Sequence, residues 1–164
     1  MTATDEVVAN NAAYAARLAE RALPAPPRRR IAVLTCMDAR IDPARALGLA
    51  DGDAHVIRNA GGVATDDALR SLVLSQRLLG TEEVMVIHHT ECGMEGLADG
   101  ELEDAIERKT GRRPAFSFGG FDDVERDVRE AVRRLQASPF LPSKRIRGFV
   151  YDVRTGALRE VATG

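Results

Sequence analysis

A short apolar run between charged residues, IAVLTC at residues 31–36, points to the class of fold. Three arginines precede this run, and the polar segment MDAR follows it at residues 37–40. A continuous apolar run bounded by charge is typical of a strand buried on both faces of a parallel sheet. Similar runs occur at residues 54–59 (AHVIRN) and 84–89 (VMVIHH). We therefore expect these three segments to be strands of one sheet.

Helical patterns alternate with the apolar runs. The apolar residues of segment 66–80 recur at helical spacing, with Thr65 as the expected N-cap and Gly80 just past the end. Because these apolar residues extend beyond one face, we expect protein to surround this helix almost completely. Two more helices are predicted, around residues 102–109 and over residues 122–137.

The carboxyl-terminal tail alternates apolar and polar residues over positions 145–161 and contains a turn signal at Thr155-Gly156. This pattern predicts a last strand and a short antiparallel return at the edge of the sheet. Strands that alternate with helices indicate an α/β fold, with a mostly parallel central sheet flanked by helices. Since the chain shows no repeat and no long polar linker, residues 1–164 are predicted to form a single domain with its α/β core at 28–164.

The amino-terminal segment, residues 1–27, places apolar side chains near helical spacing and then contains three prolines. The pattern predicts an amphipathic helix after a cap at Thr4, followed by a Pro-rich connection. The helical spacing by itself is compatible with packing of this helix on its own subunit and with packing on a partner subunit. The segment lacks a basic leading region, so we do not expect a signal peptide. With only two cysteines in the chain, a reducing cytoplasm is the expected location.

Composition and charge exclude several classes of protein. A chain of 164 residues with 45% hydrophobic and 29% charged residues can enclose a core, which argues against a disordered or membrane-spanning protein. The 23 basic and 25 acidic residues leave no basic surplus that would attract nucleic acid. Because aromatic residues make up only 4% of the chain, we expect a small-molecule pocket built from aliphatic side chains, glycine and backbone.

Residues with metal-binding chemistry stand at the ends of two predicted strands. Cys36 ends the first run, whereas His89 ends the third and Cys92 follows it. In an open parallel sheet, side chains at the carboxyl ends of strands converge. Thiolate and imidazole are ligands that Zn²⁺ favours, and three protein ligands leave a fourth position open, as in catalytic sites. The alternative is that both cysteines are small buried hydrophobes and that His89 is a hydrogen-bonded core histidine.

Asp38 and Arg40 add a carboxylate and a guanidinium at the end of the first strand. Arginine can bind aspartate through two hydrogen bonds. Such a pair would hold the carboxylate ready to accept a hydrogen bond from zinc-bound hydroxide and would keep it off the metal. The alternative is an ordinary salt bridge at a strand end.

Three motifs together resemble those of the β-class carbonic anhydrases. They are C-x-D-x-R at residues 36–40, R-N-A-G at residues 58–61 and H-x-x-C-G at residues 89–93. The resemblance covers most of the chain, from residue 31 through the tail that ends near residue 161, and its spacing fits the compact prokaryotic members.

This resemblance implies an enzyme that hydrates carbon dioxide reversibly to bicarbonate and a proton, by attack of zinc-bound hydroxide. It implies one Zn²⁺ per chain, held by Cys36, His89 and Cys92. Asp38 and Arg40 would form the catalytic dyad beside the metal. Asp38 is also a conditional fourth ligand in a closed state, and we expect the open, water-bound state at alkaline pH.

Other residues near these motifs receive weaker assignments. His88 is expected to point to the opposite face of the sheet from His89, in a core or supporting role. Because histidine as a residue type can transfer protons near neutral pH, His55 and His88 are considered as proton carriers, but neither is placed in the catalytic set. Gly61 and Gly62 are expected to line the substrate cleft, and the competing hypothesis is a phosphate-binding loop.

The resemblance also implies partners. Family members form dimers or higher oligomers in which the amino-terminal helix embraces the partner, so we expect a homodimer or a dimer of dimers. Carbon dioxide and bicarbonate are the expected small molecules, with no nucleic acid and no membrane. Relatives with the same ligands hydrolyse carbonyl sulfide or carbon disulfide, which is one alternative. A noncatalytic, zinc-stabilised bicarbonate-binding module is the other.

Overall fold

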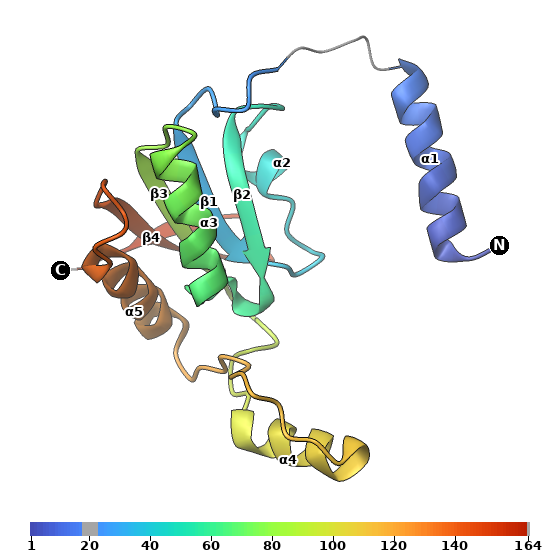
Figure 1. Cartoon of the computed structure of the whole chain (residues 1–164), viewed down its shortest axis with the longest axis vertical. Helices are drawn as coiled ribbons and strands as arrows, with labels where there is room; N and C mark the ends of the chain where they lie inside the picture. Colours follow the sequence, from blue (N-terminus) through green and yellow to red (C-terminus); the bar gives the residue numbers. More distant parts are fainter. Residues whose placement is uncertain (18–22, 164) are drawn as a thin grey trace.

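The computed structural model, which describes residues 1–17 and 23–163, contains a five-stranded sheet (Figure 1). Its strands are β1 (Ile31–Cys36), β2 (Ala54–Asn59), β3 (Glu83–His89), β4 (Arg145–Tyr151) and β5 (Leu158–Val161). Their order across the sheet is β2-β1-β3-β4-β5, with the first four parallel and β5 antiparallel to β4. The predicted α/β fold, with a mostly parallel sheet and an antiparallel edge, is confirmed.

The helices lie largely where helical spacing predicted them. They are α1 (Ala3–Arg17), α2 (Pro43–Leu47), α3 (Asp66–Arg77), α4 (Asp99–Thr110) and α5 (Val124–Ala137), with a 3-10 turn, η1, at Ala60–Gly62. The predicted cap of α3 is confirmed, because the side chain of Thr65 accepts a hydrogen bond from the Ala68 amide. Helix α4 extends beyond the predicted segment 102–109 at both ends, whereas α5 begins slightly later than predicted.

The short helix α2 was not predicted, although its sequence contains recognisable signals. The Asp42 side chain accepts a hydrogen bond from the Arg45 amide, which caps the first turn. Pro43 occupies the start of the helix, and Gly48 ends it in the left-handed conformation at φ 63°. The helix is too short for apolar periodicity to reveal it.

The sheet separates two apolar layers because successive side chains of a strand point to opposite faces. On one face, α3 and α5 pack over alternate residues of β1 and β3 to form the main core (Figure 1). On the other face, Val33, Ile87 and Phe149 form a smaller buried cluster, against which the partly buried Leu47 of α2, Met85 and Tyr151 pack.

The prediction that protein surrounds α3 almost completely was wrong. Ala68 and Leu72 are buried, but the side chains of Leu74 and Leu78 are 42% and 72% exposed. Leu74 lies in α3 and Leu78 directly follows its last residue, and both keep much of their surface exposed in the single chain. The extra apolar residues therefore form a surface instead of a second buried face.

Helix α1 lies apart from the sheet, and none of its residues is buried (Figure 1). Its cap is Thr2 and not Thr4, because Thr2 exchanges two hydrogen bonds with Asp5, at 2.7 and 3.2 Å. The last apolar positions of the predicted helix, Leu18 and Ala22, lie outside the described residues. Within residues 1–17 and 23–163, no helix has the length and apolar character needed to cross a membrane.

The strand order brings two predicted site segments together. From β1 the chain passes to β2 on one side, and β3 then pairs with β1 on the other side. The carboxyl ends of β1 and β3 are therefore adjacent at a point where the direction of winding changes, which is where ligands bind in open α/β sheets. Cys36 is the last residue of β1, and His89 is the last residue of β3.

Candidate metal centre

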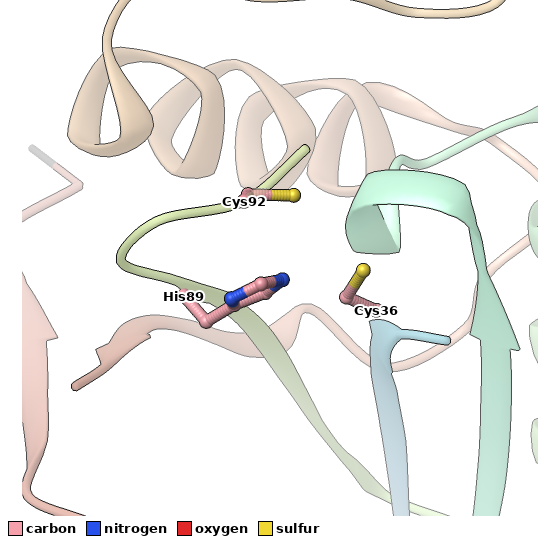
Figure 2. Close-up of side chains that lie close together, drawn as sticks. All are labelled: Cys36, His89 and Cys92. Carbon is pink, nitrogen blue, oxygen red and sulfur yellow. The ribbon is translucent and has the colours of Figure 1, made fainter. Parts of the chain in front are cut away.

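Cys36, His89 and Cys92 meet at the carboxyl edge of the sheet, as their sequence spacing predicted. Their possible ligand atoms all lie within 4.8 Å of one another, and all three residues are buried. Figure 2 shows Cys36 at the end of β1, with His89 and Cys92 entering from the chain that leaves β3. Neither cysteine forms a disulfide. Two thiols and one imidazole around a common point are a donor set that suits Zn²⁺.

The protonation of His89 leaves one ring nitrogen available as a ligand. Its Nδ1 atom lies 2.9 Å from the carbonyl oxygen of Thr90, and a carbonyl can only accept, so Nδ1 carries the proton. Nε2 is buried and has no hydrogen-bond partner in the part of the chain that the structure describes. Burial also lowers the pKa of His89, which favours the neutral ring. A buried lone pair without a partner, facing two thiols, fits a bound metal ion.

Cys92 lies in the same dry environment. Burial, together with the nearby Cys36, raises the pKa of Cys92 to about 11. A thiol with such a pKa keeps its proton near neutral pH unless a cation replaces it. Metal binding at this group therefore releases a proton.

Asp38 and Arg40 form the predicted pair beside the three candidate ligands. The guanidinium donates through Nε to Oδ1 at 3.0 Å and through Nη2 to Oδ2 at 2.7 Å. These hydrogen bonds hold the pKa of the Asp38 carboxyl well below its usual range. Oδ2 of Asp38 lies 3.8 Å from Nε2 of His89. An ionised carboxylate is thus fixed at the rim of the ligand cluster, with its oxygens bound to Arg40.

Glu91 is a site residue that sequence reasoning missed. It lies between two of the ligands and adopts a left-handed conformation at φ 55°, which is uncommon for a residue other than glycine. Its carbonyl oxygen accepts a hydrogen bond from Arg40 at 2.9 Å, and its carboxylate lies 3.5 Å from the same guanidinium. Arg154 also donates to this carboxylate. Its acidic side chain inside the H-x-x-C motif was the signal that could have drawn attention to it.

Gly61 and Gly62 are buried where close packing requires glycine. At Gly62, with φ 73°, an added Cβ would lie 2.9 Å from the backbone nitrogen of Cys36. At Gly61, an added Cβ would lie 2.9 Å from Val63 and 3.3 Å from Met94. The two glycines therefore let the η1 turn pack directly against the end of β1.

His88 points away from His89, as predicted. It is fully buried, and its Nε2 atom lies 3.2 Å from the carbonyl oxygen of Gly62. On the other side of its ring, Nδ1 lies 3.1 Å from Oδ2 of Asp127 on α5. The His88 ring therefore lies between the η1 turn and helix α5. The other histidine outside the motif, His55, lies next to Ser75, with 2.7 Å between Nδ1 and Oγ.

The expectation of a pocket without aromatic side chains was wrong in one respect. Phe121 packs with Cys36 and Cys92 in one buried cluster and stacks on His88 with 5.9 Å between ring centroids. Phe121 returns to the site through hydrogen bonds with Met94 and Gly96 after the chain has passed through α4. No local pattern marks it, because its role depends on contacts with residues far away in the sequence.

Comparison with known proteins places the whole arrangement in a family. A family model described as carbonic anhydrase matches residues 31–158. β-Carbonic anhydrase 1 of Mycobacterium tuberculosis (strain ATCC 25618 / H37Rv) is 50% identical over 98% of this chain and 99% of its own length. A carbon disulfide hydrolase of Acidianus sp. (strain A1-3) is 34% identical over 82% of this chain and 78% of its own length.

A solved structure agrees with these sequence matches. The crystal structure of carbonic anhydrase from Streptococcus mutans superposes with a TM-score of 0.93 and 43% identity, covering 99% of both chains. The agreement extends over the sheet, the helices and the segments that carry Cys36, His89 and Cys92. The chain belongs to the β-carbonic anhydrase family.

Proposed function

We propose that this protein catalyses the reversible hydration of carbon dioxide to bicarbonate and a proton, with one Zn²⁺ held by Cys36, His89 and Cys92. The Asp38–Arg40 pair carries the proposal. A metal site that only stabilises the fold needs nothing beyond the metal ligands. Here the ionised carboxylate of Asp38 is also held in place, 3.8 Å from Nε2 of His89. Membership of the β-carbonic anhydrase family supports the same reaction.

The roles of the side chains follow from charge and hydrogen bonding. Zn²⁺, when bound, would supply the Lewis acidity that lowers the pKa of water and makes it a nucleophile. Asp38 would accept a hydrogen bond from the attacking water and so direct a lone pair towards the carbon of carbon dioxide. Arg40 would keep Asp38 ionised and hold its oxygens away from the ligand cluster.

The surroundings of the thiols suit a small substrate without net charge. Phe121, Met94 and Val124 pack around the two cysteines and supply apolar surface. In this proposal, Gly61 and Gly62 line the cleft through their backbone, because they let η1 pack directly against the end of β1. No phosphate loop is needed to explain them.

Hydrolysis of carbon disulfide or carbonyl sulfide is the second candidate, because a carbon disulfide hydrolase is among the relatives. The higher identity to a β-carbonic anhydrase favours carbon dioxide. A noncatalytic bicarbonate-binding module is disfavoured, because it would not need the ordered Asp38–Arg40 pair. A stopped-flow assay of zinc-loaded protein with carbon dioxide and carbonyl sulfide in parallel tests the choice. Faster turnover of carbonyl sulfide would overturn it.

We also propose a homo-oligomer, a dimer or a dimer of dimers, in which α1 packs on the partner and residues 28–164 form the catalytic core. Val7, Val8 and Tyr14 of α1 are 50% to 65% exposed, so the helix has an apolar stripe with no partner among the described residues. On the sheet face that carries Val33, the neighbouring side chains of Leu47, Met85 and Tyr151 are only partly buried and offer matching apolar surface. A cytoplasmic location is part of the same proposal, because both site thiols must stay reduced to bind metal.

A further inference from the structure

Arg58 reaches from β2 across to the segment that follows β1. It is the residue before the last in β2 and lies opposite Thr35 in the parallel pairing. Its Nε atom donates to the carbonyl oxygen of Cys36 at 2.9 Å, and its Nη2 atom donates to the carbonyl oxygen of Asp38 at 2.8 Å. One guanidinium therefore binds both ends of the three-residue segment that carries a metal ligand and the dyad carboxylate.

This segment lies where sheet pairing stops. The amide of Met37 still donates to the carbonyl oxygen of Asn59 at 2.9 Å, but β2 ends at that residue and the chain turns into η1. Arg58 thus supplies side-chain donors beyond the point where the backbone of β2 leaves β1. Buried or half-buried carbonyl groups need such partners.

The chemistry of arginine suits this bridge. A guanidinium presents several N–H groups in a fixed plane, so it can bind two carbonyls at once, whereas a lysine ammonium is a compact charge on a flexible stem. Within residues 1–17 and 23–163, Arg58 makes no ion pair of the kind that Arg40 makes with Asp38. Its hydrogen bonds go to the backbone of the site segment.

The opposite side of the same backbone is also held. Gly62 packs against the peptide between Thr35 and Cys36, and His88 lies 3.2 Å from the Gly62 carbonyl oxygen. The backbone of Cys36 is thus confined between η1 on one side and the Arg58 guanidinium at its carbonyl. Rotation of this segment would turn the Cys36 thiol and the Asp38 carboxylate away from their common point.

We propose that Arg58 is a positioning residue of the metal centre, because its guanidinium fixes the Cys36–Asp38 backbone so that thiol and carboxylate face the same point. The role at Asp38 rests on the proposed function, whereas the role at Cys36 requires only that the site holds a metal. Arg58 acts through the backbone and touches no reacting atom.

The test compares Arg58→Met and Arg58→Lys with the matched control Arg77→Met. Arg77, at the end of α3, donates to one backbone carbonyl, that of Phe140 at 2.8 Å, in a segment that carries no candidate metal ligand. The measurements are the rate at which zinc-loaded protein loses Zn²⁺ to an excess of chromogenic chelator, and kcat and KM for carbon dioxide hydration.

Arg58→Met removes two hydrogen bonds, and each contributes modestly to the stability of the Cys36–Asp38 segment. Zinc release should therefore accelerate about fivefold to tenfold. We expect kcat to fall about tenfold with KM changed less, because misplacing Asp38 affects the transition state more than substrate entry. Arg58→Lys should recover part of both effects. Arg77→Met should match the wild type.

Zinc release is measured without reference to turnover, so it tests the positioning of Cys36 even if the protein proves inactive with carbon dioxide. Wild-type zinc release and wild-type kcat in Arg58→Met would overturn the proposal, as would equal changes in Arg77→Met. If Arg58→Met does not fold, Arg58→Lys provides the measurement. An unfolded Arg58→Lys beside a folded Arg77→Met would also overturn the proposal, because Arg58 would then act on the stability of the whole fold.

Discussion

The Nδ1–H group of His89 donates a hydrogen bond to the carbonyl oxygen of Thr90, its neighbour in the chain, over 2.9 Å. This contact determines which ring nitrogen carries the proton, and it turns the lone pair of Nε2 towards Cys36 and Cys92. The candidate metal centre therefore has its histidine tautomer selected without a bound ion. Preorganisation of this kind is common for histidine ligands, whose second nitrogen usually has a fixed partner.

Replacing Arg40 by alanine should sharply reduce turnover while zinc stays bound. Asp38 would lose the guanidinium hydrogen bonds that orient it, and we expect kcat to fall about 100-fold because the attacking water is no longer directed. Steady-state hydration kinetics together with metal analysis check this. Arg147→Ala, which breaks a similar two-bond pair with Glu160, is the control and should leave kcat unchanged. Wild-type kinetics in Arg40→Ala would remove Arg40 from the mechanism.

Two glycine-to-alanine substitutions should distinguish the loss of stability caused by backbone strain from the loss caused by a packing clash. Gly62 and Gly80 have nearly equal φ, 73° and 72°, but an added Cβ at Gly80 would meet nothing within 4 Å. Gly80→Ala should lower the free energy of unfolding by about 1 kcal/mol through strain alone. Gly62→Ala should lower it by about 2 to 4 kcal/mol, because overpacking against the Cys36 backbone is added. Urea unfolding measures both, and equal losses would contradict the packing found at Gly62.

The stability that Asp53 contributes should depend on pH in a defined window. A hydrogen bond from the Ala50 amide, aided by the Arg28 guanidinium, lowers the pKa of Asp53 from 3.8 to about 2. Because the folded pKa is lowered, the ionised carboxylate stabilises the fold fully above pH 3.8, and this contribution is lost as pH falls towards about 2.

Urea unfolding of the wild type and Asp53→Asn at several pH values checks this dependence. At neutral pH the wild type should have a larger free energy of unfolding than Asp53→Asn. This difference should shrink as pH falls from 3.8 towards about 2. Asp67→Asn removes an exposed carboxylate that pairs with Arg70, so it should change stability little at any pH. A difference for Asp53→Asn that stays constant down to pH 2 would be inconsistent with this account.

Adding a charge to the apolar stripe of α1 should weaken assembly. Val8 is 64% exposed in the single chain, and Val8→Asp would place a carboxylate in the proposed interface. Sedimentation velocity should show a shift from oligomer towards single chains for Val8→Asp. Ala9→Asp adds the same charge to the opposite side of the same helix and should retain the wild-type mass. A wild-type protein that sediments as single chains at micromolar concentration would rule out the proposed oligomer.

Local pattern was enough to predict the sheet and the convergence of Cys36, His89 and Cys92, because both depend on short segments. The run 31–36 identified β1, and the positions of Cys36, His89 and Cys92 after strands predicted their convergence. Helix α2 was missed because its signals lie in capping residues such as Asp42, which carry no periodicity. Sequence inspection also overstated the burial of α3, since apolar residues such as Leu78 do not reveal whether another element covers them.

The supporting residues of the site could not be predicted in the same way. Phe121 reaches the thiols only because α4 and its loop return beside Met94, and Arg58 reaches the carbonyl oxygens of Cys36 and Asp38 only because β2 pairs with β1. These roles arise from contacts across the fold. Side-chain type therefore pointed to the candidate ligands but not to the residues that hold them in place.

The most direct measurement is stopped-flow carbon dioxide hydration with a pH indicator, on protein whose zinc content has been determined by elemental analysis. The account predicts a rate that rises in proportion to bound zinc up to about one ion per chain, because three protein ligands leave one position open for catalysis. Cys92→Ser should lose both zinc and rate. Protein that holds one zinc per chain but hydrates carbon dioxide no faster than the buffer blank would contradict the account.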